Sequence, residues 1–393
     1  MRRGTFMASF IQTHLKDMNR KTVFDLLSSV DSISRAEISR RTGISSPTVI
    51  KIVSYFQEKG LVIELGEGSI STAGRKPQLI RFNPDAAWSI GVVYEGDYLD
   101  VGFVDLNGNI KHRKRFKAVA NLDEMLELRL PVILRAFMEE FGEARPSILG
   151  VGIGIPGVVD PDTAQIEFAA PIVGVKEKRD CRSLIDRLSE QIGLPVSIDN
   201  DVKSAAWGEY ITRSGEALQD LLYVSLGSGI GAGIILDGQI RRGKHSLAGE
   251  IAFTSFDPAF RMSKTEVGWI EGRLGIHPLI GKWSFLENIL NDGQAGGYPT
   301  THRGPFEEMI RYIASHLALC ISNLVAALDI TDVVLGGVTV EALGEALLDE
   351  VKEYLKRLCV IDVRCDLQLS RDPGVVGVAA IATNHRLMEW LEG

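Results

Sequence analysis

The chain has 393 residues, of which 45% are hydrophobic and 24% are charged, and its net charge is −8. This balance is that of an ordinary globular protein, and the length predicts two or three domains. We find no apolar run long enough to indicate a membrane span, and no signal peptide follows the basic start of the chain. The four cysteines form no C-x-x-C pair, which excludes a disulfide framework and favours a reducing, cytoplasmic location.

The charge is unevenly distributed along the chain. Residues 1–83 carry 13 Lys and Arg against 7 Asp and Glu, whereas residues 84–393 carry 30 against 44. A basic head on an acidic body is typical of a DNA-binding module fused to a domain with another role. A short segment can also differ in net charge by chance, so the assignment of a DNA-binding module depends on the motifs.

The basic segment predicts three short helices. The first runs from about Arg20 to Ser29, with apolar residues at helical spacing. The second opens at a capping box, in which the Ser34 hydroxyl accepts from the Glu37 amide and the Glu37 carboxylate reaches back. It ends at Gly43, and the third helix follows after a few residues. Two helices joined by a short turn with a glycine are typical of a helix-turn-helix.

The third helix predicts one buried and one exposed face. Ser46 is expected to cap it, with Pro47 at its first position. Four apolar residues should pack inward: Val49, Ile52, Val53 and Phe56. The opposite face carries polar side chains suited to phosphates and base edges: Ser46, Thr48, Lys51 and Ser54.

Two strands, at about residues 61–64 and 79–82, flank a polar, glycine-rich stretch. Its tip carries Arg75 and Lys76, two cations on an extended backbone that suits the minor groove. Together with the helices, these strands predict a winged helix-turn-helix DNA-binding domain over residues 1–83. A structural three-helix module is the alternative, and the basic charge favours DNA binding.

From Trp88 the pattern becomes that of a two-lobed α/β domain over residues 84–393, with a division near residue 200. Three predicted strands end in polar or glycine-rich loops, where α/β folds place their ligands: Pro156-Gly157, Asp199-Asn200-Asp201 and residues 227–233. A helix is expected over residues 122–141, and residues 171–179 and 281–301 should be loops. The last third should be helical apart from a strand at 332–335.

These motifs resemble those of the ROK family (repressors, open reading frames and sugar kinases), and specifically its sugar-responsive repressors. The resemblance rests on residues 34–60, 150–161, 199–209, 223–238, 249–252 and 335–337. It implies an actin/hexokinase-like ATPase fold, a homodimer or homotetramer, and a sugar bound between the lobes. The sugar-binding residues that it implies are Asn200, Asp201, Glu250, Glu271 and Gly157. A phosphate-type loop also remains at Gly227, Ser228 and Gly229.

Three departures from the family pattern bear on activity. The first phosphate loop, Asp-x-Gly-Gly-Thr in family kinases, here reads Val93-Tyr94-Glu95-Gly96-Asp97, and its carboxylates would repel a polyphosphate. Phe253 replaces the histidine of the family zinc site and no cysteine cluster follows, so we expect no metal, with Phe253 and Trp269 filling the space as core. Pro171 stands where the family often has a sugar-contacting asparagine.

The sequence therefore predicts a sequence-specific DNA-binding regulator, a repressor that responds to a sugar or sugar derivative. Its expected partners are an operator in duplex DNA and a sugar or sugar-phosphate effector, with no membrane, no cofactor and no catalytic residue. One alternative is an ATP-dependent sugar kinase with an appended DNA-binding domain. Another is a regulator whose sensor has lost its ligand and serves only for dimerisation.

Overall fold

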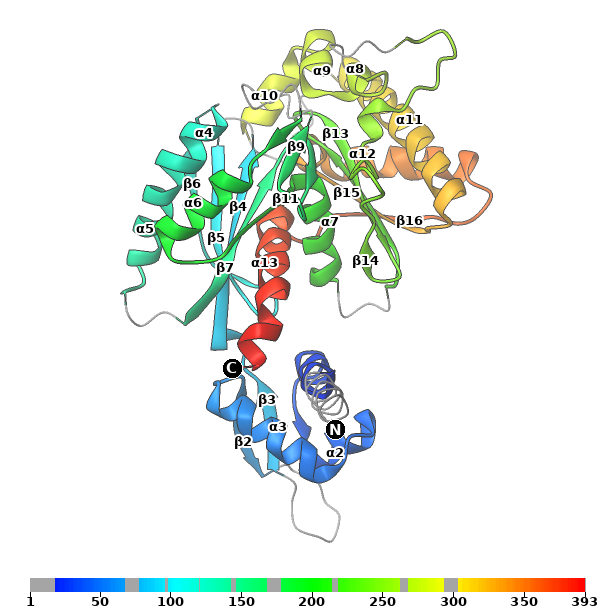
Figure 1. Cartoon of the computed structure of the whole chain (residues 1–393). Coiled ribbons are helices and arrows are strands. Elements are labelled where there is room, and N and C mark those ends of the chain that lie inside the picture. Colours follow the sequence, from blue (N-terminus) through cyan, green and yellow to red (C-terminus); the bar gives the residue numbers. More distant parts are fainter. Residues whose placement is uncertain are drawn as a thin grey trace, which may run out of the picture.

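The computed structural model describes residues 18–67, 78–95, 98–119, 121–142, 146–167, 178–213, 218–261, 268–292 and 303–392. A small N-terminal unit lies beneath a larger body that contains two five-stranded sheets (Figure 1). The C-terminal helix runs from between these sheets down to the N-terminal unit.

The N-terminal unit has three helices and a three-stranded sheet in the order β1-β3-β2, with antiparallel pairing. A helix over residues 18–28 precedes the labelled elements. These are β1 Ile33–Ser34, α2 Arg35–Thr42, α3 Ser46–Glu58, β2 Val62–Glu67 and β3 Gln78–Phe82. The four apolar residues predicted for the inner face of α3 are all buried. The loop that joins β2 to β3, with Arg75, Lys76 and the predicted wing tip, lies outside the described residues.

The caps of these helices partly follow the prediction. The Ser34 hydroxyl accepts from the Glu37 amide, and Gly43 ends α2 in the left-handed conformation, as predicted. The Glu37 carboxylate does not complete a capping box, because it pairs with Arg40 and Arg41 on its own helix. The cap of α3 is Ser45 rather than Ser46, so that prediction is wrong by one residue.

The first sheet of the body has the order β11-β7-β4-β5-β6. Its strands are β4 Ala87–Glu95, β5 Tyr98–Asp105, β6 Ile110–Lys117, β7 Ser147–Ile155 and β11 Val196–Asn200. Its outer face is covered by α4 Leu122–Glu124, a π-helical turn Met125–Arg129, α5 Leu130–Glu139 and α6 Arg182–Ile192. The single helix predicted over residues 122–141 is thus interrupted by the π-helical turn. A small separate sheet has the order β10-β9-β8 and consists of three short strands: β8 Val158–Asp160, β9 Gln165–Glu167 and β10 Arg179–Asp180.

The second sheet has the order β14-β13-β12-β15-β16. Each of the two sheets contains three strands that are consecutive in the chain and antiparallel, and two later strands that are added in parallel beside the first of the three. Its strands are β12 Leu221–Leu226, β13 Ile230–Leu236, β14 Gln239–Ile240, β15 Asp332–Gly336 and β16 Arg364–Leu367. Strand β13 takes up most of the predicted glycine loop, which leaves only residues 227–229 as the turn. Strand β16 was not predicted.

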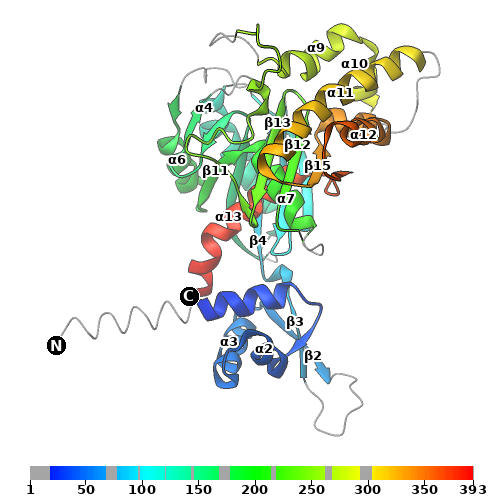
Figure 2. The ribbon, with the colours of Figure 1, turned by 90° about the vertical axis from the view of Figure 1, so that its right-hand side faces the viewer.

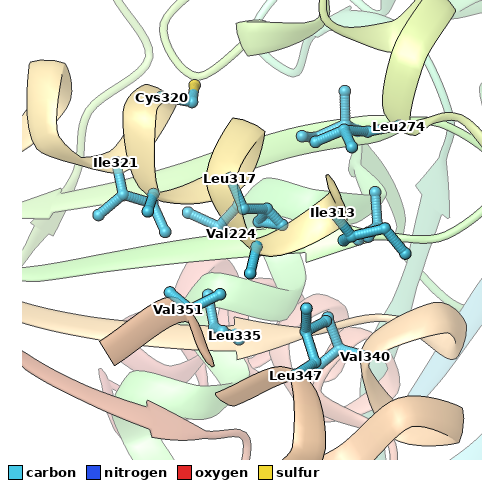
Figure 3. Packing of buried hydrophobic residues seen from close by; sticks show 14 of the residues in the cluster. Val224, Leu274, Ile313, Leu317, Cys320, Ile321, Leu335, Val340, Leu347 and Val351 are labelled. Atoms are coloured by element: carbon cyan, nitrogen blue, oxygen red, sulfur yellow. The ribbon is translucent and has the colours of Figure 1, made fainter. Parts of the chain in front are cut away.

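Helices cover the outer face of the second sheet and build the largest core (Figure 3). They are α8 Glu271–Leu274, α9 Ile276–Lys282, α10 Phe285–Asp292, α11 Arg303–Leu328 and α12 Val338–Leu358, and a short 3-10 turn spans Ile251–Phe253. Helix α10 lies within the stretch predicted as a loop. In Figure 3, Ile313, Leu317 and Ile321 of α11 lie over Val224 of β12 and Leu335 of β15.

Helix α11 is more apolar than we expected of any segment in this chain. An 18-residue window within residues 304–328 reaches a mean hydropathy of 1.4, which by length and composition alone is enough for a membrane span. Half of this window is buried in the body, where α11 packs against α12 and shares its apolar cluster with residues of the second sheet. A core helix of a globular domain has the same composition, because both of its neighbours are apolar.

Two helices lie between the sheets: α7 Asp201–Thr212 packs on the second sheet, and α13 Pro373–Glu392 packs on the first. They cross at very short range, since a Cβ on Gly377 would lie 1.7 Å from the backbone oxygen of Ser204. Glycine at this crossing lets the two backbones touch, which fixes α13 against α7 and joins the two lobes.

The far end of α13 enters the N-terminal unit (Figure 2). Leu387 is 7% exposed and belongs to the same apolar cluster as Phe56 and Phe82, and Trp390 packs against this cluster. The Lys59 ammonium lies over the Trp390 ring at 5.9 Å. The helix over residues 18–28 and α13 therefore share one core.

Candidate functional site

The predicted sugar-binding residues converge between the two sheets. Asn200 ends β11, Asp201 begins α7, and Gly157 follows β7, the strand next to β11. Glu250 lies in the loop after β14, and Glu271 begins α8. We call Asn200, Asp201, Lys203, Glu250 and Glu271 the polar cluster. Two surface hollows of about 460 and 650 Å³ lie elsewhere, at residues 218–220 with 329–332 and at residues 138–148 with 192–194.

Asn200 organises one side of the polar cluster. Its Oδ1 accepts from the Lys203 amide at 2.7 Å and so caps α7, and its Nδ2 donates to the Gly157 carbonyl at 2.8 Å and to Asp201 Oδ1 at 3.2 Å. Both donor hydrogens of the amide are therefore engaged. Gly157 has a φ of 108°, a conformation that favours glycine, so the loop that Asn200 holds is set by the sequence.

Asp201 and Glu250 accept side-chain hydrogen bonds through one carboxylate oxygen each. Asp201 Oδ1 accepts from Asn200 Nδ2 at 3.2 Å and from the Val202 amide at 2.8 Å, and the Asp201 amide itself also bonds to this carboxylate. Glu250 Oε1 accepts from the Lys203 ammonium at 2.8 Å. Glu271 lies against the residual phosphate-type loop, because a Cβ on Gly229 would be 2.6 Å from Glu271 Oε1. Free carboxylate oxygens that face one another suit adjacent hydroxyl groups.

The charge of Glu250 affects the pKa values of the other two carboxyl groups, Asp201 and Glu271. Burial raises the pKa of Asp201 to about 6, and the negative charge of Glu250 adds to this effect. Burial also raises the pKa of Glu271, again with a contribution from Glu250. Carboxyl groups whose ionisation is disfavoured by burial and by like charges are common at functional sites.

Asp201→Asn should stabilise the ligand-free protein at alkaline pH. The folded protein keeps a proton on Asp201 between about pH 4 and 6 that the unfolded chain has already released, so the stability that this group contributes falls as the pH rises through that window. Asparagine has no charge to desolvate, and we expect a gain of about 1–3 kcal/mol in the free energy of unfolding at pH 8 and little gain at pH 4.

Denaturant unfolding at the two pH values measures this difference. Asp349→Asn, at an exposed carboxylate of α12, is the matched control and should change the stability little at either pH. An equal effect of Asp201→Asn at pH 4 and pH 8 would contradict the assigned burial of its charge.

Val93 occupies the start of the altered first phosphate loop. Its side chain packs against Gly374 at the start of α13, where a Cβ would lie 3.1 Å from Val93 Cγ2. The same methyl group is 3.5 Å from a Cβ built on Gly154, and Asp201 Cα is equally close. An apolar side chain thus borders Asp201 here. Gly96 and Asp97 of this loop, and Pro171, lie outside the described residues.

Phe253 and Trp269, the two residues predicted to be core in place of a zinc site, differ in burial. Trp269 is 9% exposed and packs edge-on against Phe256, while the Arg273 guanidinium lies 3.6 Å from its ring. Phe253 is half-buried in the preceding turn. The prediction that Trp269 is a core residue agrees with this packing.

Two charged contacts at the site were not predicted from the sequence. Arg242, in the loop after β14, binds both oxygens of Asp199 at 2.6 and 2.5 Å and so ties the second lobe to the end of β11. Lys203 is buried and pairs with Glu250. A lysine beside Ser204, Ala205 and Ala206 is the pattern that could have drawn attention, because lysine is rarely buried without a partner.

The exposed face of α3 carries the residues predicted to contact DNA. Ser46, Lys51 and Ser54 are exposed, and Thr48 is half-buried. Two of the hydroxyls have local partners: Ser46 bonds to Ser39 at 3.3 Å, and Thr48 to Ser45 at 2.8 Å. Ile50 was not predicted for this face, yet it is 51% exposed.

Comparison with known proteins agrees with this architecture. Residues 89–266 match the model of the ROK family. The chain contains a ROK family domain. A xylose repressor from Bacillus subtilis (strain 168) is 29% identical over 63% of this chain, and the matched part covers 62% of that relative's length. The DNA-binding transcriptional dual regulator NagC of Escherichia coli (strain K12) is 22% identical over 91% of this chain and 89% of its own.

Solved structures with a ROK domain share the fold of this chain. A ROK family transcriptional regulator, a homolog of the E. coli MLC protein, aligns with a TM-score of 0.75 and 18% identity, over 97% of this chain and 100% of its own. A ROK family glucokinase from Streptomyces griseus, in complex with glucose and AMPPNP, aligns with a TM-score of 0.61 and 24% identity, over 76% of this chain and 99% of its own. The α/β fold predicted for the body is thereby confirmed.

Proposed function

We propose that this protein is a sequence-specific DNA-binding transcriptional repressor, controlled by a sugar or sugar derivative bound at the polar cluster, and without kinase activity. The observation that carries the proposal is the joining, in one chain, of a helix-turn-helix unit to a ROK domain. Repressors are named among the relatives of nearly full length, and the regulator structure aligns with both parts of the chain.

The N-terminal unit supplies the DNA-binding surface as a winged helix-turn-helix of residues 1–83. Helix α3 would lie in the major groove, with Lys51 on a phosphate and with Thr48 and Ser54 toward base edges. Ile50 adds an exposed apolar side chain that suits a thymine methyl group. Arg75 and Lys76 of the wing would reach the minor groove.

The polar cluster supplies the effector site. Asp201, Glu250 and Glu271 would accept hydrogen bonds from sugar hydroxyls, while Asn200 and Gly157 hold the surrounding loops. Three carboxylates face one ammonium here, so a neutral sugar should bind better than its phosphate ester. The names of similar proteins give the panel to test: xylose, N-acetylglucosamine and glucose.

The absence of kinase activity rests on the first phosphate loop. Val93 provides packing against Gly374 in place of a polar group, and the loop sequence offers Glu95 and Asp97 to a polyphosphate. Asp201, which matches the general base of the family kinases, would then only hold a hydroxyl group. We propose a cytoplasmic homodimer or homotetramer, as expected for a repressor that binds paired half-sites.

The full-length protein should select a discrete site from a random duplex library, and the same preparation should release no ADP from ATP with any sugar of the panel.

The affinity for the selected DNA site should fall steeply with salt, and Lys51→Ala should lower the slope of log K against log salt by about 0.9 because one phosphate contact is lost. Thr48→Ala should instead weaken discrimination between the selected site and random DNA, by about 1 kcal/mol.

Lys356→Ala removes an exposed cation of α12 in the body and is the control for overall charge. If the protein selects no site, or if its affinity for DNA does not fall with salt, the proposal that it is a DNA-binding repressor is wrong. A turnover of about 1 per second in the coupled ADP assay would establish the kinase instead.

A further inference from the structure

Lys203 is the cationic member of the polar cluster. Its side chain is 1% exposed, and its Nζ donates to Glu250 Oε1 at 2.8 Å. The side chain extends from the first turn of α7 to the loop after β14, an edge strand of the second sheet. This is the direct ion pair between α7 and the predicted sugar-binding carboxylates.

Burial at this position would suit an apolar side chain better than a charge. Lys203 is among the largest fully buried side chains of the described residues, and methionine is an unbranched apolar side chain of similar length. Taking an ammonium and a carboxylate out of water costs free energy that their attraction seldom exceeds. An ion pair retained at such a position therefore points to an electrostatic role.

That role follows from the groups that face Glu250. Lys203 and Asp201 face it from α7, and Glu271 faces it from α8. Without the ammonium, three carboxylates would meet with no counter-charge, and at least one of them would take up a proton near neutral pH. A protonated carboxyl group loses part of its capacity to accept hydrogen bonds from sugar hydroxyls.

We infer that Lys203 is a positioning residue of the effector site: its ammonium is the counter-charge of the carboxylates there and holds the Glu250 carboxylate in one orientation, with Oε2 left for a sugar hydroxyl. Lys203 acts through Glu250 and need not touch the sugar. The inference rests on the proposed function for the part that concerns sugar binding, whereas the coupling of the two side chains can be measured without any sugar.

The first test uses the ligand-free, full-length protein. Lys203→Met should lose stability relative to wild type as the pH rises from about 5 to 8, because the folded variant must give up the extra proton that its unshielded carboxylates hold. In the Glu250→Gln background, the effect of Lys203→Met should depend much less on pH, because Lys203 then acts on the Asp201 charge alone. The double variant has a neutral pair of nearly the same shape, so it also serves if Lys203→Met alone folds poorly.

The second test measures sugar affinity against pH with xylose, N-acetylglucosamine and glucose. For the sugar that binds wild type, the ratio of the Lys203→Met affinity to the wild-type affinity should fall by about tenfold between pH 8 and pH 6, as a change of one unit in a proton equilibrium requires. Lys356→Met, at an exposed lysine, should follow wild type at every pH.

The outcomes are distinguishable. A pH-independent ratio, with sugar bound normally by wild type, would overturn the role of Lys203 and leave the proposed function intact. A stability difference that does not depend on pH, or whose pH dependence is equally large in the Glu250→Gln background, would also overturn it. If no sugar of the panel binds wild type at any pH, the proposed effector site fails together with this inference, whatever the stability measurements give.

Discussion

An effector sugar should change the affinity of the protein for its operator by about 5- to 150-fold, and Glu250→Gln or Asp201→Asn should abolish this response. The physical reason is the path of α13. Its first turn packs on Val93 beside Asp201, and its last turns enter the core of the N-terminal unit. Closure of the lobes around a sugar would shift α13 and with it the DNA-binding units of a dimer, whose spacing must match DNA turns of about 34 Å.

The measurement is a titration of the operator with and without sugar, for wild type and both variants. The coupling must be reciprocal, so operator DNA should change the sugar affinity by the same factor. DNA binding without sugar should stay at the wild-type level in both variants, since neither residue lies near α3. Asp349→Asn should respond to sugar like wild type. A normal response of the Asp201 and Glu250 variants would place the effector site elsewhere.

Leu387→Asp should abolish operator binding while the two-lobed body stays folded. Leu387 is 7% exposed within the apolar cluster of the N-terminal unit, and a carboxylate there would be buried without a partner. Such a charge costs several kcal/mol, which is comparable to the whole stability of a small domain. We expect a loss of more than about a hundredfold in affinity, equivalent to about 2.7 kcal/mol.

Hydrogen exchange reports on the two parts separately. Amides of residues 20–60 should lose protection in Leu387→Asp, whereas those of β4, β7 and β12 should keep it. Val360→Asp is the matched control, because Val360 is fully exposed in the loop after α12 and the same charge is added there. Operator binding at the wild-type level in Leu387→Asp would mean that the N-terminal unit does not depend on α13.

The sequence was most informative where local chemistry decides the structure. The Ser34 cap and the Gly43 stop of α2 depend on a few adjacent residues, and both were predicted correctly. Where two local solutions compete, sequence alone does not choose. Glu37 could reach back to its cap or pair with Arg40 and Arg41, and adjacent serines, Ser45 and Ser46, could each begin α3.

The elements that were not predicted depend on contacts between residues far apart in the sequence. Gly231 and Gly233 were predicted to lie in a loop, yet they belong to β13, where their small size leaves room for Val202 and Ala206 of α7. Strand β16 has four residues and pairs only at the sheet edge, so its pattern is too short to recognise. The residues implied for the sugar site do meet, but the partner of Glu250 was missed, because Lys203 is brought to it only by the packing of α7 between two sheets.

The core shared by the helix over residues 18–28 and α13 bears on the order of events during synthesis. Residues 18–67 leave the ribosome long before Leu387 and Trp390, which pack into their core. Domains commonly fold as they emerge, N-terminal ones first. Here the core of the N-terminal unit is completed only once α13 has been made, so a chain that stops before α13 should hold this unit in a less stable form.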